Sequence, residues 1–227
     1  PIILSQQELL NHILYCPDDY FSKFNETDFK VRNVSSLDEY KKKIEDSTCK
    51  PSNKILYKLK KAINIANLRI KRLSYKYKNT YCGIDLDKLN HIRWKIGIVC
   101  NDNYENGMPH TRHDVIIISS NDIDSDSLNT LSDTLVHEKI HVYQKLYGED
   151  VELYLKLNKI KKIKKNTKSD YIPANPDIDN YTYINNKKII YRAKYLPHAT
   201  SIHDIKLPFD DDAFEHPFEE MAYELLQ

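Results

Sequence analysis

The sequence predicts an α+β fold in which a helical N-terminal region, residues 1–79, precedes a domain of residues 80–227 that combines a small sheet with helices. Over residues 52–78, apolar residues recur every three or four positions with basic residues between them, which indicates one long amphipathic helix. Two strand-like runs, residues 92–99 and 114–119, flank a polar loop and are expected to be neighbouring strands. A chain of 227 residues can form one sizeable domain with a smaller appendage.

Two capping boxes predict short helices in the N-terminal region. Ser5 is followed three residues later by Glu8, and Ser36 in the same way by Glu39. In this arrangement the two side chains satisfy backbone amides that a helix start leaves free. Each box should therefore open a helix.

The second half of the chain is expected to contain three helices and a hairpin. Capping residues at the start of residues 124–147 predict a helix over that range. Residues 149–165 resemble another helix, because their basic C-terminal end suits the helix dipole. A hairpin is expected over residues 181–194, and a final helix over residues 217–227, which begin with a Pro.

Composition argues against several classes of protein. The chain is 41% hydrophobic and 30% charged, and no apolar run approaches the roughly 20 residues of a membrane span. The net charge of +1 argues against nucleic-acid binding, and the basic run of residues 156–168 is interpreted as a solvated helix face. Because the N-terminus lacks the features of a signal peptide, an intracellular, cytoplasmic protein is expected.

The four cysteines predict neither a zinc ribbon nor a disulfide scaffold. Cys16, Cys49, Cys82 and Cys100 are far apart and form no CxxC pair. We expect free thiols in a reducing compartment.

The motif that carries chemistry is His137-Glu138-Lys139-Ile140-His141, an HExxH sequence inside the helix expected over residues 124–147. Residues four apart share one helix face, so His137 and His141 can hold one Zn²⁺. Glu138 is then placed as the general base that takes a proton from water held by the metal. With 9 His in the chain, about 0.02 such motifs are expected by chance.

A catalytic zinc needs a third protein ligand, which HExxH does not supply. The pattern HExxHxxGxxH does not follow, since Gly148 lies too far on and no His occupies the required place. A metzincin is therefore not expected. The acidic segment of residues 215–224 offers a Glu on a later helix instead.

With these two segments the chain resembles the gluzincin metallopeptidases, in which a Glu on a later helix completes an HExxH site. In branches with an ExxA second motif the first Glu is the ligand, which implies Glu219 with Ala222. Glu220 is the alternative, because Glu220 and Glu224 match the ExxxD-like spacing of other branches. The Asp usual four residues after the ligand is Tyr223 here.

The resemblance also implies a zincin-like fold, with the small sheet packed on the HExxH helix and on the Glu-bearing helix. The strand of residues 114–119 would lie along the cleft and pair with an extended peptide through its exposed edge. A Tyr or His would stabilise the developing oxyanion. Candidates between or beside the two motifs are Tyr191, Tyr195, His198, His203 and His216.

The favoured function is hydrolysis of peptide bonds in a peptide or protein substrate, with one zinc per chain, Glu138 as base and Glu219 completing coordination. A catalytically silent, zinc-stabilised binding or structural protein is the first alternative. A zinc hydrolase of non-peptide amides is the second. The N-terminal region could pack on the catalytic unit, block the cleft as a propeptide or bind a partner.

Overall fold

The computed structural model describes residues 1–207 and 214–226 and has a mixed α+β fold. Its α-helices are α1 (Gln6–Tyr15), α2 (Glu26–Val31), α3 (Leu37–Glu45), α4 (Asn53–Lys76), α5 (Leu86–His91), α6 (Ser120–Ser125), α7 (Leu128–Leu146), α8 (Gly148–Leu157) and α9 (Pro217–Tyr223). Its strands are β1 (Ile2–Ile3), β2 (Thr80–Tyr81), β3 (Ile84–Asp85), β4 (Lys95–Val99), β5 (His110–Arg112), β6 (Val115–Ser119), β7 (Lys161–Lys165), β8 (Tyr181–Ile184), β9 (Ile190–Tyr191), β10 (Lys194–Tyr195) and β11 (Ile205–Lys206). Short 3-10 turns are η1 (Tyr20–Lys23), η2 (Glu105–Gly107), η3 (Lys168–Asp170) and η4 (Glu224–Leu226).

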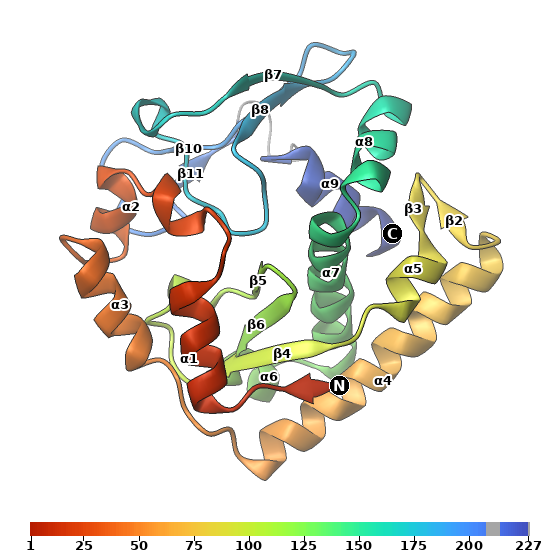
Figure 1. The fold of residues 1–227 in the computed structure, drawn as a ribbon, viewed down its shortest axis with the longest axis horizontal. Helices are drawn as coiled ribbons and strands as arrows, with labels where there is room; N and C mark the ends of the chain where they lie inside the picture. Colours follow the sequence, from red (N-terminus) through yellow and green to blue (C-terminus); the bar gives the residue numbers. More distant parts are fainter. Residues whose placement is uncertain (208–213, 227) are drawn as a thin grey trace.

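A four-stranded sheet of order β1-β4-β6-β5 lies at the centre of the molecule (Figure 1). β4 pairs with β1 and with β6 in parallel, and β5 pairs antiparallel with β6. The expectation that the runs of residues 92–99 and 114–119 form neighbouring strands is therefore confirmed.

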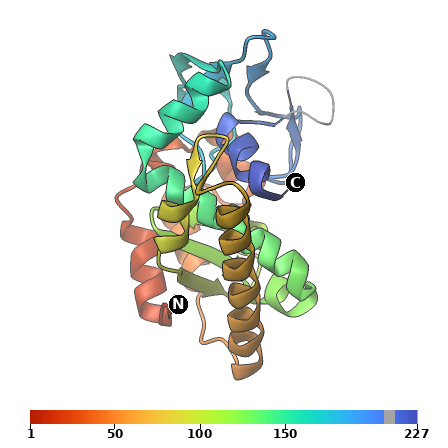
Figure 2. The ribbon, with the colours of Figure 1, turned by 90° about the vertical axis from the view of Figure 1, so that its right-hand side faces the viewer.

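Helices cover both faces of this sheet. Successive strand residues point to opposite faces, so Ile116 and Ile118 join the core formed with α4 and α7, whereas Val115 and Ile117 join the core formed with α1 and α3. Figure 2 shows the sheet between α1 on one side and α4 on the other. Gly97 allows α1 to approach β4, because a Cβ at this position would clash with the Leu9 side chain.

The long helix expected over residues 52–78 is confirmed as α4. The Ser52 hydroxyl caps it by accepting from the Ile55 amide at 3.3 Å. The central part of its apolar stripe, which includes Leu59, Ala66 and Ile70, is fully buried and packs along α7. Together with β1, α4 makes the N-terminal region part of the sheet and core that support the HExxH motif.

The HExxH helix is confirmed as α7, and its start is the Ser127 cap, whose hydroxyl accepts from the Thr130 amide at 3.1 Å.

The expectation of one helix over residues 149–165 is wrong in its second half. α8 ends at Leu157, Lys159 adopts a left-handed φ of 56°, and the chain continues as β7 paired with β8. Strand pairing thus overrides the helical charge pattern. The expected hairpin of residues 181–194 is confirmed by the pairing of β8 with β9.

Two of the four cysteines are paired. A disulfide joins Cys49, between α3 and α4, to Cys100 at the end of β4, with Cα atoms 5.9 Å apart. That separation is within the range for disulfides. The expectation of free thiols is wrong for this pair, because the fold joins positions 51 residues apart. The expectation is confirmed for Cys16 and Cys82, which are free.

None of the described helices is long and apolar enough to cross a membrane.

Candidate metal centre and active site

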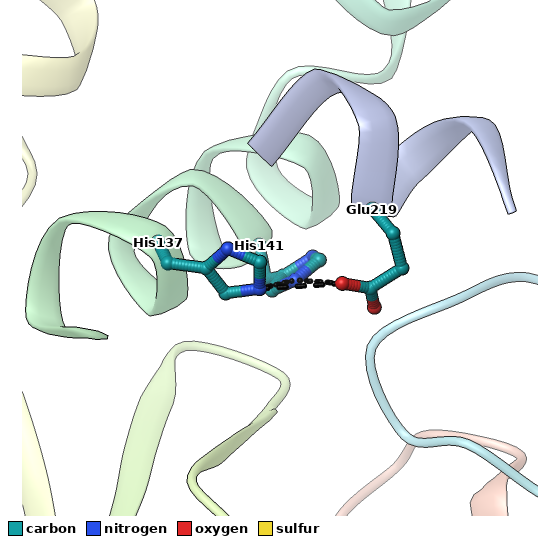
Figure 3. A group of neighbouring side chains, drawn as sticks. All are labelled: His137, His141 and Glu219. Carbon is teal, nitrogen blue, oxygen red and sulfur yellow. Dashed lines mark hydrogen bonds and ion pairs between the residues drawn. The ribbon is translucent and has the colours of Figure 1, made fainter. Parts of the chain in front are cut away.

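α7 and α9 bring three potential metal ligands together (Figure 3). His137 and His141 project from the same face of α7, and their Nε2 atoms are 3.0 Å apart. The Glu219 Oε2 atom on α9 lies 3.2 Å from His137 Nε2 and 3.5 Å from His141 Nε2. The structure therefore places the three sequence-predicted ligands around one point.

The spacing of these donor atoms fits a zinc ion. With zinc–ligand bonds of about 2.0–2.1 Å, two ligands of a tetrahedral ion lie roughly 3.3 Å apart. The three separations fall on either side of this value. Two imidazole nitrogens and one carboxylate oxygen are also the donor set of a common type of catalytic zinc site, which leaves a fourth position open.

Gln144 orients the deeper histidine. His141 is fully buried, and its Nδ1 donates to Gln144 Oε1 at 2.9 Å, because an amide oxygen can only accept. In the neutral ring that a metal requires, this bond leaves the unprotonated Nε2 facing the cluster. Burial opposes protonation of the ring, but Glu219 and Asp177 outweigh it and raise the pKa of His141 to about 10, so a metal would have to displace a proton from Nε2. The Gln144 amide nitrogen in turn donates to the Phe218 carbonyl at 2.8 Å, which links α7 to the first turn of α9.

Local sequence explains how α9 presents Glu219. His216 caps the helix by accepting from the Phe218 amide at 3.2 Å, and Pro217 occupies the first helical turn. Glu219 therefore stands in the first turn, facing α7. Burial opposes ionisation of its carboxyl, but His141 and His137 hold its pKa well below the usual range.

Glu138 lies beside the cluster on the side of β5. Its side chain is 3% exposed, and Thr111 donates from its hydroxyl to Glu138 Oε2 at 3.0 Å. Burial, and then the charge of Asp177, raise the pKa of Glu138 to about 8. A raised pKa makes the carboxylate a stronger base, but at about 8 the carboxyl is mostly protonated near pH 7. It would accept a proton there once a cation in the cluster lowered its pKa.

An open cleft of about 550 Å³ gives access to the cluster. His137, Glu138 and Glu219 line it together with three further acids, Asp133, Asp177 and Glu215. Burial, and then the charge of Glu219, raise the pKa of Glu215 to about 7. The cleft walls are thus rich in carboxylates.

The alternative ligand Glu220 lies apart from the cluster. Its Oε2 accepts from the Tyr191 hydroxyl at 2.5 Å. The Tyr191 hydroxyl is thereby engaged by Glu220, and the Tyr195 hydroxyl donates to Asp28 at 2.8 Å. Neither hydroxyl therefore points to the histidines.

The oxyanion candidates named from the sequence do not reach the cleft. The residues that line it include none of Tyr191, Tyr195, His198, His203 and His216 among those the structure describes. Tyr223 lines it instead, with its ring 4.7 Å from the His137 ring. Burial, and then Glu219 and Glu138, raise the pKa of Tyr223, so its hydroxyl keeps its proton near these carboxylates. Its position four residues after Glu219, on the same helix face, is the signal that could have identified it.

The expectation of an exposed edge on the strand of residues 114–119 is wrong. β6 is an inner strand, and β5 covers the edge that faces the cluster. The outer edge of β5 is itself occupied at Thr111, whose amide donates to Asp177 and whose carbonyl accepts from Lys145, both at 2.7 Å. An extended substrate could pair only beyond this point, where Met108 and Pro109 line the cleft.

Helix α4 of the N-terminal region contacts α7 and the residues just after α9. Arg69 on α4 forms an ion pair with Asp133, one turn before His137 on α7. The same guanidinium donates to the Leu226 carbonyl at 3.3 Å, just after α9. Both ligand-bearing helices are thus linked to α4.

Comparisons of the chain with protein-family models, with curated proteins and with solved structures gave no match. The function must therefore be inferred from the residues of the site.

Proposed function

We propose that this protein is a zinc-dependent metallopeptidase of gluzincin type, with His137, His141 and Glu219 as the zinc ligands. The observation that carries the proposal is the triangle of two imidazole nitrogens and one carboxylate oxygen, with sides of 3.0, 3.2 and 3.5 Å. Glu138 beside this triangle supports an enzyme over a silent zinc protein, because a structural zinc site needs no general base.

When bound, zinc would act as a Lewis acid toward the scissile carbonyl and would lower the pKa of a water molecule. Glu138 takes the proton from that water at its carboxylate and then delivers it to the leaving amine. Thr111 holds this carboxylate in place through its hydroxyl. Burial keeps the base poorly hydrated and therefore more basic.

Tyr223 is assigned to the developing oxyanion. Its phenol is a proton donor at neutral pH, because its pKa is raised, and it lines the cleft beside His137. A donor placed in advance beside the reacting carbonyl stabilises the transition state more than the ground state.

The finer fold assignment belongs to the same proposal. Residues 80–227 would form a zincin-like catalytic domain, an assignment supported by the order of a small sheet, the HExxH helix α7 and the ligand-bearing helix α9. Hydrolysis of a non-peptide amide would use the same groups, and substrate profiling separates it from peptide hydrolysis.

The test is zinc content per chain together with hydrolysis of a peptide library. The protein should hold about one zinc, as should the Glu138→Gln and Glu220→Ala variants, whereas His137→Ala and Glu219→Ala should lose it. Glu138→Gln should abolish cleavage although it retains zinc. If no form binds zinc after the metal is supplied, the proposal is wrong.

A further inference from the structure

A second cavity, of about 180 Å³, adjoins the cleft. Four residues line both spaces: Met108, Asn175, Asp177 and Glu215. A side chain of a substrate held in the cleft could therefore extend into this cavity. A cavity of about 150 Å³ accommodates a molecule as large as benzene, so a long side chain fits.

Two carboxylates stand where the cavity meets the cleft. Asn175 connects them, since its amide nitrogen donates to Glu215 at 2.6 Å and its amide oxygen accepts from the Asp177 backbone at 2.7 Å. Asp177 also accepts from the Thr111 amide. Asp177 forms a long ion pair with the Lys145 ammonium at 3.8 Å, which is beyond hydrogen-bond distance. These two acids thus keep acceptor capacity for a further donor.

His110 adds a buried acceptor to the same cavity. It is 2% exposed, and its Nδ1 donates to the Met108 carbonyl at 2.8 Å. Burial lowers the pKa of His110, so the ring is neutral near pH 7 and its Nε2 can only accept. This nitrogen has no hydrogen-bond partner among the described residues. A buried polar atom without a partner is costly unless a ligand satisfies it.

The remaining charged groups of the wall neutralise one another. Arg32 is paired with Glu105 at 2.6 Å and also bonds to Asp28. The cavity therefore offers acceptors from Asp177, Glu215 and His110 and no unpaired cation among the described residues. Apolar wall residues, such as Pro173 and Ile202, suit a methylene stem.

We propose that this cavity is a specificity pocket for the lysine or arginine side chain of a peptide substrate, beside the scissile bond, with Asp177, Glu215 and His110 as acceptors for its N–H groups. The inference rests on the proposed peptidase function. It names a substrate class, peptides with a basic residue next to the cleaved bond.

The first test compares matched peptides that carry Lys or its uncharged analogue norleucine, which lacks only the ammonium group, at each position, cleaved by the zinc-loaded protein. We expect kcat/KM to favour Lys by about tenfold or more, as charged hydrogen bonds do. Glu215→Gln and Asp177→Asn should each lower the ratio of Lys to norleucine toward one. Glu149→Gln, an exposed acid on α8, should leave the ratio unchanged.

The second test does not need hydrolysis. Binding of n-butylammonium and of n-butanol to the metal-free protein is measured by calorimetry, with the thermal stability of each variant as a check on folding. The amine should bind more tightly than the alcohol, and Glu215→Gln should remove the difference.

The two tests separate the two proposals. Peptide cleavage without a preference for Lys, and without selective amine binding, overturns the pocket and leaves the peptidase intact. Selective amine binding without cleavage of any peptide supports the pocket and overturns the peptidase.

Discussion

Tyr223 contacts the His137 ring and lines the cleft, yet it contributes no atom to the metal cluster. Tyr223→Phe keeps the ring and removes only the hydroxyl. We expect kcat to fall about 10²–10³-fold, the usual effect of losing one oxyanion donor, with zinc content and KM nearly unchanged. Steady-state kinetics with a cleaved peptide measure this. A variant with full kcat would remove Tyr223 from the chemistry.

Gln144 contacts His141 and would act on the proposed zinc through that ring, so its replacement should weaken zinc binding and leave the three proposed ligands in place. Gln144→Ala is expected to lower zinc affinity by about 10–100-fold, as loss of a group that orients a ligand commonly does. Competition with a chromogenic chelator gives the affinity. Asn129→Ala, an exposed residue on the same helix, is the control and should match the unaltered protein.

Among the elements, β5 carries Thr111 toward Glu138 and is held on its other side by a buried ion pair. Arg112 is 0% exposed and donates to Asp18, in the turn after α1, at 2.6 and 2.8 Å. Asp18→Asn should lower the free energy of unfolding by about 3 kcal/mol at pH 7, because the guanidinium loses its charged partner. Urea denaturation measures the difference.

The stabilisation by the ion pair of Asp18 with Arg112 should decrease as the pH falls. Burial raises the pKa of Asp18, but Arg112 outweighs it and the net pKa is lowered. The ion pair therefore stabilises the fold above the unfolded pKa of about 3.9, and the stabilisation is lost as pH falls through the folded pKa. The two proteins should converge in strongly acidic solution. Asp19→Asn, at an exposed neighbour, should change stability by less than about 1 kcal/mol at any pH.

For the molecule as a whole, the Cys49–Cys100 disulfide joins the N-terminal helical region to the central sheet. It closes a loop of 51 residues, so its reduction should lower the free energy of unfolding by about 4 kcal/mol in the chain-entropy model. Denaturation with and without reductant measures this. The same loss is expected for Cys49→Ser, and none for Cys82→Ser at the exposed free thiol. Equal stability of all four forms would show that the bridge contributes nothing.

Features encoded by nearby residues could be predicted from the sequence. The i, i+4 spacing of His137 and His141 follows from helix geometry alone, and Ser127 begins the helix that carries them. The periodicity of α4 likewise predicted its buried stripe. Glu219 was chosen by resemblance rather than by local physics, and the fold places its carboxylate beside both histidines.

Features that depend on contacts between distant segments could not be predicted in this way. The sequence alone determined the helices α7 and α4 and indicated the strands β4 and β6, because helix periodicity, caps and strand patterns act over a few residues. The chemistry of HExxH stays a prediction. Only the tertiary structure decided that residues 161–165 form a strand, that β5 covers β6, and that Cys49 meets Cys100. It also decided that Gln144 and Tyr223, on neighbouring helices, flank the cluster of His137, His141 and Glu219. Each of these outcomes depends on burial and pairing across the chain, which outweigh local preference once the core is packed.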